Sequence, residues 1–367
     1  MRTIKNCRVA VVGGAGFLGS HLVNHLIDDR QCEVVVVDNL VTGRREFIHP
    51  KAEFVHHDIT KSEGRLRAIF AGCKFVFNYA AEPYIPVSFA RPLHVFETNA
   101  TGAIQCINAA QEAGCEGILQ VSSAEIYGHA GGSEREMSML GCKISELFNV
   151  TPHSTYGAAK AAVDYYCQTA WRERQTPVIT LRQFNCVGER ETHPYIVPEI
   201  IGQLARQFKD TPFEECPKCD AKPGMPLLCE SCLKRRTECH TTSSVPGVVK
   251  LGNNSFRDFL YAGDAVKTAV ELLERGQFGE VYNLGSETGV QMYDLPHIIG
   301  RLMGFKSITV EKDPVRVRPW EIWHLQSDNT KLRKCLGVWK NSTPLEEALK
   351  KTIKWYQENG SRWPWEK

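Results

Sequence analysis

The chain has 367 residues, of which 43% are hydrophobic and 23% are charged, a balance typical of a folded globular protein and not of a disordered one. Its 44 Lys and Arg against 42 Asp and Glu give a formal net charge of +2, which excludes the strong positive charge of a typical duplex-binding protein. The longest apolar run, around residues 9–19, is too short to cross a bilayer, and no signal-peptide layout precedes it. We therefore expect a soluble cytoplasmic protein with no membrane partner.

The first half of the chain alternates between apolar strands and amphipathic helices. Strands are predicted at residues 9–12, 33–37, 53–56, 75–78, 118–122 and 178–182, with helices between them that include 96–113 and 158–174. Continuously apolar strands are typical of a parallel sheet covered on both faces. The alternation therefore predicts a doubly wound α/β fold.

The alternation loosens after residue 184. Helices are predicted at residues 198–208, 264–275 and 344–359, and regular structure resumes at residue 248 after a Cys-, Pro- and Lys-rich stretch. We expect residues 1–184 to form a nucleotide-binding domain, to which later segments can return. Residues 185–367 are expected to form a smaller lobe packed on that domain.

A glycine-rich turn joins the first strand to the first helix, with the spacing G-x-x-G-x-x-G. Gly13 permits the tight turn, Gly16 lets the backbone approach a pyrophosphate, and Gly19 permits close packing of helix on sheet. The N-terminus of the helix offers free N–H groups and a positive dipole end to phosphates. The turn therefore predicts a dinucleotide site.

Asp38 closes the second strand, about 20 residues after the glycines. A carboxylate there can accept both hydroxyls of the adenosine ribose and would repel a 2′-phosphate, so NAD is favoured over NADP. NADP stays an alternative, because Arg44 and Arg45 follow in the sequence and could hold a 2′-phosphate. Asp58, after the third strand, is expected either near the adenine or as a helix cap.

Tyr156 and Lys160 lie four residues apart on one face of a predicted helix. An ammonium so placed stabilises a phenolate and lowers the tyrosine pKa, so the tyrosine can remove a sugar hydroxyl proton as hydride leaves. Residues 122–125, Ser-Ser-Ala-Glu, stand at the carboxyl end of a strand, where ligands sit in open α/β sheets. We expect the catalytic centre there.

These motifs together resemble the extended short-chain dehydrogenases/reductases, in their NAD-dependent nucleotide-sugar epimerase/dehydratase branch. The resemblance covers nearly the whole chain apart from about residues 213–247, and it implies a Rossmann domain followed by a substrate-binding lobe. The matching runs are the glycine turn, Asp38-Asn-Leu, Asn78-Tyr-Ala-Ala81, Asn99-Ala-Thr-Gly102, Ser-Ser-x-x-x-Tyr-Gly, the Tyr156/Lys160 pair, Arg182-Gln-Phe-Asn185, Gly188-Glu-Arg190 and Arg257-Asp-Phe-Leu-Tyr261.

The resemblance implies that Tyr156 is the catalytic base, Lys160 its electrostatic partner, and Ser123 a hydrogen-bond donor to the sugar oxygen being oxidised. NAD would be tightly held and regenerated within each cycle, and a homodimer would form through the helices near residues 96–113 and 158–174. Cofactor contacts are expected at Gly13, Gly16, Phe17, Leu18, Gly19, Asp38, Asn39, Asp58, Ile59, Ala80, Ala81, Asn99, Ser122, Tyr156 and Lys160.

The resemblance also implies substrate contacts in both halves of the chain. Asn185 would approach the diphosphate, and Arg257 would hold the phosphates or the nucleotide. Arg318 can clamp a diphosphate because Arg forks suit phosphate oxygens, although a solvated turn is the alternative. The full expected set is Glu82, Tyr84, Ser123, Glu125, Asn185, Arg190, Arg257 and Arg318, of which Glu82 and Tyr84 could equally serve loop packing.

Glu125 bears on the reaction subclass. Family 4,6-dehydratases place a carboxylate here to move protons at the sugar's 5-position and 6-hydroxyl, decarboxylases acting on nucleotide-linked glucuronic acid also carry a Glu, and simple 4-epimerases usually have a small or apolar residue. Ser123-Ala124-Glu125 keeps the Glu but lacks the dehydratase-type Asp. Dehydration is favoured, with 4-epimerisation and decarboxylation as alternatives. A Glu that only caps a loop or pairs with an Arg would have no catalytic role.

Four of the fourteen cysteines form two C-x-x-C pairs, Cys216/Cys219 and Cys229/Cys232. Each pair can give two thiolates to one tetrahedral ion, so the pairs predict a structural zinc ribbon inserted at residues 213–247, with an iron site as the alternative. Four thiolates leave no open position for catalysis. The ribbon could order a lid, read the nucleotide base or extend an oligomer contact.

A function of a different class stays open: an NAD-sensing scaffold whose ribbon binds nucleic acid or a protein partner. Such proteins generally lose the Tyr/Lys pair, whereas Tyr156, Lys160 and Ser123 are all present here. We therefore expect an enzyme that modifies a nucleotide-diphosphate sugar through a 4-keto intermediate. Nucleic acid is not an expected partner.

Overall fold

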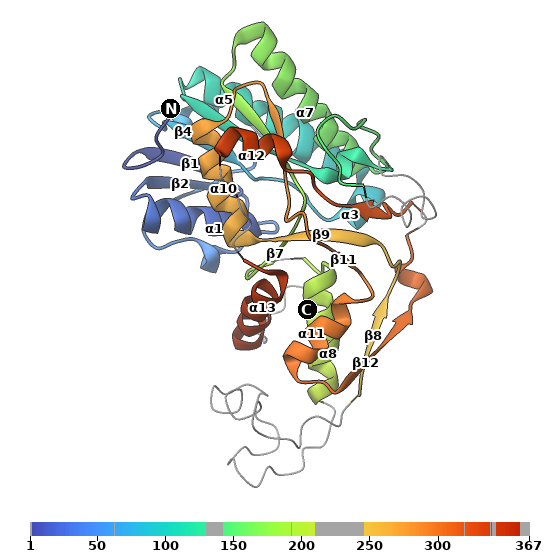
Figure 1. Cartoon of the computed structure of the whole chain (residues 1–367). Helices are drawn as coiled ribbons and strands as arrows, with labels where there is room; N and C mark the ends of the chain where they lie inside the picture. The colour runs from blue at the N-terminus through green and yellow to red at the C-terminus, as the bar shows by residue number, and fades with distance from the viewer. Residues whose placement is uncertain are drawn as a thin grey trace. The chain divides into compact units, whose positions relative to one another are not determined.

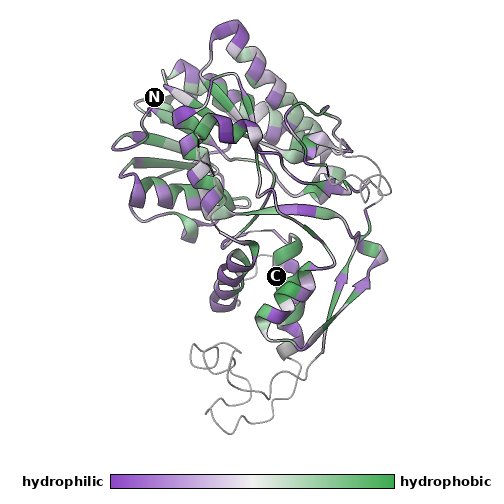
Figure 2. Cartoon of the chain, viewed as in Figure 1, coloured by the Kyte–Doolittle hydropathy of each residue, from purple (hydrophilic) through white to green (hydrophobic). Residues whose placement is uncertain are grey.

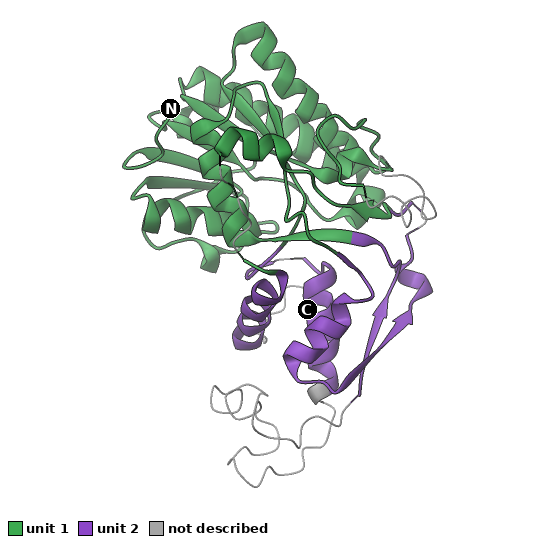
Figure 3. Cartoon of the chain, viewed as in Figure 1, with its two compact units in different colours: residues 1–186, 257–289, 322–344 green, residues 187–256, 290–321, 345–367 purple. Residues whose placement is uncertain are grey.

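The computed structural model describes residues 2–61, 63–129, 142–191, 193–209, 246–318, 320–337, 339 and 343–359. The chain divides into two compact units (Figure 3). Unit 1 comprises Met1–Cys186, Arg257–Gly289 and Ile322–Pro344, and unit 2 comprises Val187–Phe256, Val290–Glu321 and Leu345–Lys367. Two later segments of the chain therefore return to the first unit.

Unit 1 is built on a seven-stranded sheet with the order β10-β6-β5-β4-β1-β2-β3 (Figure 1). All six neighbouring pairs run in parallel, as in the register of Val9 with Val34 on one side and with Phe75 on the other. The predicted doubly wound parallel sheet is confirmed. Its strands are β1 Arg8–Val12, β2 Glu33–Asp38, β3 Glu53–His56, β4 Phe75–Asn78, β5 Gly117–Ser123, β6 Val178–Gln183 and β10 Val281–Leu284.

Helices connect these strands, and they begin and end close to the predicted positions. The longest, α7 at Thr155–Arg174, begins after the cap Ser154, whose Oγ accepts a hydrogen bond from Gly157 N–H at 3.0 Å. The remaining helical elements of unit 1 are α1 Phe17–Asn24, η1 His25–Asp29, η2 Arg45–Phe47, α2 Glu63–Phe70, α3 Ile85–Ala90, α4 Pro92–Phe96, η3 Glu97–Gly102, α5 Ala103–Glu112, η4 Ala124–Tyr127, α10 Ala262–Arg275 and α12 Thr330–Leu336.

The core of unit 1 lies on both faces of the sheet. Val9 and Val11 pack into one apolar cluster with residues of α1 and α10, whereas Ala10 and Val12 pack into a second with residues of α2, α5 and α7. Successive strand residues point to opposite faces, so one cluster lies on each face. In Figure 2 the central strands are mostly green, while α7 carries both colours, as expected of a helix with one buried side.

Unit 2 contains three helices and a two-stranded parallel sheet among its described residues. These are α8 Ile196–Lys209, α11 Leu295–Met303, α13 Leu345–Asn359, and the paired strands β8 Pro246–Leu251 and β12 Ser307–Lys312, followed by the short turn η6 Pro314–Arg316. A separate small sheet has the order β11-β9-β13 with β7 paired to β9, where β7 is Asn185–Val187, β9 Phe256–Tyr261, β11 Gly289–Gln291 and β13 His324–Leu325. Its strand β13, and all of β9 except Phe256, belong to unit 1. Among all these described helices, none has the length and apolarity required to span a membrane.

Two glutamine side chains of α8 pair with the edge of β8 that does not face β12. Gln203 accepts a hydrogen bond from Lys250 N–H at 2.8 Å and donates one to Lys250 C=O at 3.0 Å. Gln207 likewise accepts a hydrogen bond from Val248 N–H at 2.8 Å and donates one to Val248 C=O at 2.5 Å. The two amides stand one helical turn apart, so they take the place of a neighbouring strand along this edge.

Candidate active site

The glycine turn lies at the carboxyl end of β1, against the turn that follows β4. Gly13 has a φ of +78°, and a Cβ on it would lie 2.6 Å from Ala80 N. A Cβ on Gly19 would lie 2.0 Å from Gly13 O. Both positions therefore require glycine. The two turns meet between β1 and β4, where the strand order reverses, and ligands of open α/β sheets bind at such a switch point.

The first residues of α1 present uncapped backbone N–H groups at this point. Gly16 is the N-cap residue of α1, no side chain caps the helix, and its first turn carries no acidic residue. Phe17 and Leu18, the first two helical residues, therefore offer backbone donors and the positive end of the helix dipole to an anion. These features fit a pyrophosphate, so the residues present are compatible with NAD.

Asp38 is held rigidly at the end of β2. Its carboxylate accepts hydrogen bonds from Ala15 N–H at 3.0 Å and from Leu40 N–H at 2.8 Å. It is buried, and this burial raises its pKa although both hydrogen bonds oppose the shift. A Cβ on Gly43 would lie 2.8 Å from Asp38 Oδ1, so the following loop folds over the carboxylate. The aspartate therefore braces the glycine turn as well as closing the strand.

The two arginines that kept NADP open are both engaged elsewhere. Arg44 forms an ion pair with Glu46 at 3.2 Å, and the Arg45 guanidinium lies 4.2 Å from the centre of the Phe54 ring. Asp58 accepts hydrogen bonds at Oδ1 from the N–H and the hydroxyl of Thr60, so it makes a local turn. Its expected place near the adenine stays a prediction.

Asn99 fixes the turn after β4 from the adjacent helical segment η3. Its Oδ1 accepts a hydrogen bond from Glu82 N–H at 2.7 Å, and its Nδ2 donates one to Glu82 C=O at 2.9 Å. Asn99 is completely buried. It was expected to contact the cofactor, and the structure shows that it anchors the turn bearing Ala80, Ala81 and Glu82, a role that local sequence does not reveal.

The structure brings the predicted tyrosine, lysine and serine together at the end of β5 and the start of α7. Ser123 Oγ accepts a hydrogen bond from Glu125 N–H at 3.2 Å, and the Ser123 side chain also hydrogen-bonds to the Tyr156 hydroxyl. Lys160 Nζ donates to Val121 C=O at 3.1 Å and lies 6.0 Å from the centre of the Tyr156 ring. All three are buried.

The electrostatics of this cluster differ from the prediction made from the Tyr/Lys spacing. Burial raises the pKa of Tyr156 to about 12; the bond from Ser123 opposes the shift, and the carboxylates of Glu125 and Glu82 add to it. Burial lowers the pKa of Lys160 to about 8. The predicted lowering of the tyrosine pKa is therefore wrong for the chain by itself, because desolvation outweighs an ammonium that is directed at Val121 C=O.

Two carboxylates lie within electrostatic reach of Tyr156. Glu125 follows Ser123 at the start of η4, and its placement beside the tyrosine agrees with the sequence. Glu82 is 8% exposed, its Oε1 accepts a hydrogen bond from Tyr84 N–H at 3.2 Å, and burial raises its pKa. Glu82 was expected in the substrate site only through the family resemblance, since it and Tyr156 belong to different turns far apart in the sequence.

Asp258, beside the predicted substrate residue Arg257, is a buried anchor that the sequence analysis did not single out. Its carboxylate accepts hydrogen bonds from Ser286 N–H, Glu287 N–H and both the N–H and hydroxyl of Ser327, at 2.6 to 3.0 Å. These bonds fix the strand β9, and with it Arg257, which is buried. The sequence signal for this buried anchor is a charged Asp directly after an Arg within a strand, where a carboxylate must find hydrogen-bond donors.

The remaining predicted substrate residues lie in β7 and in unit 2. Asn185 lies in β7, and its Oδ1 is buried with no hydrogen-bond partner among the described residues. Arg190 and Arg318 belong to unit 2, where Arg318 C=O accepts a hydrogen bond from Asn253 at 2.9 Å. Arg316, near Arg318, is engaged by Glu199 at 2.8 Å and by Asp313 at 3.2 Å.

The predicted metal ligands Cys216, Cys219, Cys229 and Cys232 lie outside the described residues. Within the part of the chain that the structure describes, no group of three or more His, Cys, Asp or Glu side chains could hold a metal ion. None of the nine cysteines in that part forms a disulfide.

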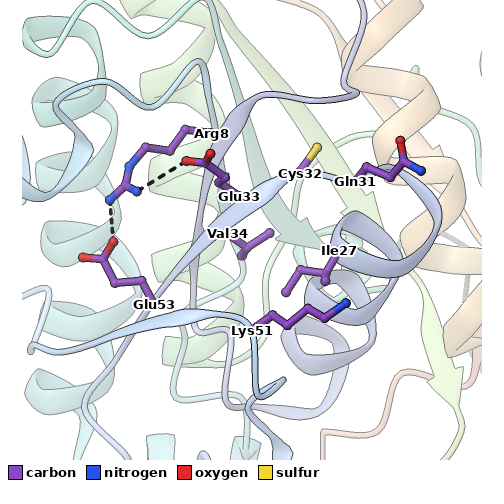
Figure 4. Close-up of a pocket in the computed structure, with 8 residues that line it drawn as sticks. All are labelled: Arg8, Ile27, Gln31, Cys32, Glu33, Val34, Lys51 and Glu53. Carbon is purple, nitrogen blue, oxygen red and sulfur yellow. Dashed lines mark hydrogen bonds and ion pairs between the residues drawn. The ribbon is translucent and has the colours of Figure 1, made fainter.

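Figure 4 shows a pocket of about 470 Å³ that lies away from the predicted centre. It is lined by Arg8, Glu33 and Glu53, which are the first residues of β1, β2 and β3, and Arg8 pairs with Glu53 at 2.6 Å. The pocket therefore opens at the amino ends of the strands, whereas ligands of such sheets bind at the carboxyl ends.

Comparisons with known proteins agree with this geometry. Residues 9–285 match the model of the NAD dependent epimerase/dehydratase family. The dTDP-D-glucose 4,6-dehydratase of Mus musculus is 27% identical over 97% of this chain and 90% of its own length. A putative UDP-glucose 4-epimerase of Methanocaldococcus jannaschii is 27% identical over 96% of this chain and 99% of its own length.

The crystal structure of a UDP-glucose 4-epimerase from Thermotoga maritima, solved with UDP-glucose, has the same fold. The TM-score is 0.76 at 24% identity, covering 96% of this chain and 99% of that one. The family model spans well over half of the chain, and the glycine turn, Asp38 and the Tyr156/Lys160 cluster lie inside it. The protein therefore belongs to the NAD dependent epimerase/dehydratase family and is an NAD-dependent enzyme.

Proposed function

We propose that the protein is a 4,6-dehydratase of a nucleoside-diphosphate glucose, acting through a 4-keto intermediate. The observation that carries this proposal is Glu125 at the carboxyl end of β5, whose carboxylate acts electrostatically on Tyr156 and whose backbone N–H donates to Ser123 Oγ. An oxidation and return of hydride at the sugar 4-position needs no second acid or base. A carboxylate beside the oxidising pair supplies the proton transfers that loss of water requires.

When bound, NAD would supply the hydride acceptor for oxidation at the sugar 4-position and the hydride donor for the later reduction. Tyr156 takes the proton of the 4-hydroxyl, and Ser123 donates a hydrogen bond to that oxygen as it becomes a ketone. Glu125 then removes the proton at the 5-position, which the new ketone has made acidic, and delivers a proton to the leaving 6-hydroxyl. Water leaves, the hydride taken from the 4-position returns to the 6-position, and the proton taken from the 4-hydroxyl returns to the 5-position. The product is the 4-keto-6-deoxy sugar nucleotide, with the cofactor oxidised again.

The cofactor assignment is proposed on three features. Phe17 and Leu18 offer uncapped N–H donors to the pyrophosphate, and Asp38 offers carboxylate oxygens to the ribose hydroxyls. The engagement of Arg44 and Arg45 by other groups supports NAD over NADP. The remaining sequence-derived contacts stand as proposals: for the cofactor Asn39, Asp58, Ile59, Ala80, Ala81, Asn99 and Ser122, and for the substrate Glu82, Tyr84, Asn185, Arg190, Arg257 and Arg318.

The deciding experiment is mass spectrometry of the products formed from a panel of nucleoside-diphosphate sugars, with isomers separated by chromatography. Loss of one water is the expected result. Glu125→Gln should still bind NAD and give the near-ultraviolet absorbance of reduced nicotinamide on mixing with substrate, but should release dehydrated sugar about a hundredfold more slowly, at a rate that can still be measured. A Glu125→Gln enzyme that dehydrates at the wild-type rate would contradict the role given to Glu125.

A 4-epimerase is the second candidate. Ala124 stands where dehydratases carry an Asp, and epimerases are among the similar proteins. In that case the product has unchanged mass and a new configuration. Loss of carbon dioxide from a uronic acid would instead select the decarboxylase. NAD binding with no turnover of any sugar would favour the NAD-sensing scaffold.

We propose that the protein forms a homodimer through α3, α4 and α7. Phe89, Leu93, Phe96 and Tyr165 are all exposed on these helices, and Leu93 is 78% exposed. Four large apolar side chains on neighbouring helices form a surface that favours association. Sedimentation should show a dimer that Leu93→Asp converts to a monomer, whereas Val315→Asp, at an even more exposed apolar position in unit 2, should leave it intact.

The zinc ribbon is proposed from the spacing of Cys216, Cys219, Cys229 and Cys232 alone. Elemental mass spectrometry of the purified chain should find one zinc per chain. Cys216→Ser should lose the metal, whereas Cys335→Ser, which replaces a free thiol of α12, should keep it. Iron in place of zinc, or no metal in the wild type, would overturn the assignment.

A further inference from the structure

Four buried polar side chains form a network behind the predicted centre. Arg182 of β6 donates two hydrogen bonds to Asp164 of α7, from Nε to Oδ2 at 2.9 Å and from Nη2 to Oδ1 at 3.1 Å. Arg182 Nη1 also donates to the Tyr127 hydroxyl at 2.8 Å, and Tyr127 donates to Asn283 Oδ1 at 2.6 Å. None of the four residues is more than 4% exposed.

The protonation states of this network are fixed at neutral pH. Burial raises the pKa of Tyr127 to about 12, so its hydroxyl stays protonated and can donate to Asn283. Burial lowers the pKa of Arg182, but the hydrogen bonds and charge of Asp164 outweigh it, and the net pKa lies above its usual range. A buried ion pair of this kind is no better for stability than apolar packing, whereas its hydrogen bonds impose one geometry.

The network joins the two elements that carry the proposed chemistry. Asp164 lies two helical turns after Tyr156 and one after Lys160, on the same inward face of α7. Tyr127 is the last residue of η4, the short helix that begins directly after Ser123 and holds Glu125. A continuous chain of hydrogen bonds therefore runs from the helix of the base, through β6, to the helix of the carboxylate.

The helix η4 has only four residues and depends on such anchors. Its start is fixed by the Ser123 cap, and its backbone by Thr151, whose N–H donates to Ile126 C=O at 2.9 Å and whose hydroxyl donates to Tyr127 C=O at 2.8 Å. A Cβ on Gly157 would lie 3.1 Å from Glu125 C=O, so α7 packs directly on η4. The Tyr127 side chain is the anchor that reaches β6 and β10.

We propose that Tyr127 is a positioning residue, whose hydroxyl, held by Arg182 and Asn283, fixes η4 so that the Glu125 carboxylate keeps its place beside Tyr156. The inference rests on the proposed function, because it concerns the proton transfers given to Glu125. Displacement of an acid or base by about 1 Å costs up to a hundredfold in rate. Loss of this anchor should therefore slow the dehydration step and leave binding intact.

The test compares Tyr127→Phe with a matched control, Tyr166→Phe. Tyr166 lies on α7, outside η4, and like Tyr127 it joins an Arg to an Asn, since its hydroxyl accepts from Arg174 and donates to Asn108. We expect Tyr127→Phe to lower kcat for water loss about tenfold or more, with KM and bound NAD unchanged, and Tyr166→Phe to leave all three at wild-type values.

A second readout separates positioning from a general loss of structure. The groups that face Tyr156, namely Ser123, Glu125, Glu82 and Lys160, are the same in both variants. Because the charge of Glu125 raises the Tyr156 pKa, movement of η4 away from the tyrosine should shift the Tyr156 limb of the pH–rate profile to lower pH. A variant that merely unfolds in part would lower the amplitude of the profile without moving the limb.

A double-mutant cycle with Glu125→Gln completes the test. If Tyr127 acts through Glu125, Tyr127→Phe should cause no further loss in the Glu125→Gln background. An equal factor in both backgrounds, or equal losses in Tyr127→Phe and Tyr166→Phe, overturns the proposal. Should Tyr127→Phe fail to fold, Arg182→Lys keeps the charge next to Asp164 but cannot hold both partners, and the same loss is expected. Failure of the proposed function would appear separately, as wild-type enzyme that releases no water.

Discussion

At the scale of single residues, Lys160 shows that the centre is built at a cost in stability. Its ammonium is 3% exposed, and burial lowers its pKa from 10.5 to about 8. A lysine whose pKa is lower in the folded than in the unfolded state reduces the free energy of unfolding as long as it is charged. This penalty is complete below pH 8 and is relieved as pH rises from 8 toward 10.5, because the unfolded chain then holds more protons.

We therefore expect Lys160→Met to raise the free energy of unfolding at pH 7 by about 1–3 kcal/mol while abolishing turnover. The stability gained by Lys160→Met should shrink from pH 8 to pH 10, as Lys160 of the wild type loses its charge. This difference between the two proteins isolates Lys160 from the buried cysteines, whose raised pKa values lower the stability of both above pH 9. Denaturant unfolding across this range, with the variant as control, measures both effects. Lower stability of Lys160→Met at pH 7 would contradict this account.

Asp38 supports a second prediction, on cofactor choice. Asp38→Asn removes the negative charge but keeps one acceptor for Ala15 N–H. We expect weaker NAD binding, by about tenfold, because a charged acceptor of the ribose hydroxyls is lost. NADP should not be gained, because Arg44 and Arg45 are engaged by Glu46 and Phe54. Cofactor titration with both dinucleotides tests this, and tight NADP binding by the variant would contradict it.

At the scale of elements, the turn after β4 depends on Asn99 more than on its own sequence. Asn99→Ala would leave the buried N–H and C=O of Glu82 without these partners, at a cost of about 2–3 kcal/mol of stability. Asn108→Ala, on the neighbouring α5 and partly exposed, should cost less than half of that. Thermal unfolding of the two variants gives the comparison, and equal losses would show that Asn99 is not a special anchor.

The elements themselves were largely predictable from the sequence. The strands at 9–12 and 33–37 are continuous apolar runs, and they differ from the observed β1 and β2 by one residue at an end. The single helix predicted at 96–113 is instead divided into the end of α4, the π-helical η3 and α5. Side-chain periodicity cannot show this division, because the wider turn of η3 accompanies the contact of Asn99 with a distant loop.

The candidate site was predictable only where its residues share a motif. The gathering of Ser123, Tyr156 and Lys160 agrees with the strand-end and helix-face arguments. The nearness of Glu82, and the bond of Tyr127 to Asn283, join residues separated by many elements. Neither leaves a local pattern in the sequence. The family resemblance alone placed Glu82 in the expected substrate set, and the bond of Tyr127 is revealed only by the three-dimensional pairing of strands.

At the scale of the whole molecule, unit 1 is not a continuous piece of chain. Strand β10, which pairs with β6 and carries Asn283, comes from residues after the first crossing into unit 2. A chain ending at Cys186 would therefore expose the edge of β6 and leave Tyr127 without one partner. We expect that fragment to be insoluble or to bind no NAD, whereas a chain ending at Asn359 should remain soluble and bind it. A soluble, NAD-binding fragment 1–186 would show that unit 1 folds without its later segments.

The glutamine pair of α8 has a consequence for how this chain tolerates change. Gln203 and Gln207 join α8 directly to β8, so the bonds that hold the two elements do not pass through the connection at residues 210–245. The length of that connection is thus uncoupled from the placement of the elements it joins. An insertion of a whole domain between α8 and β8 can therefore be tolerated during evolution, because the hydrogen bonds of Gln203 and Gln207 keep the two elements paired.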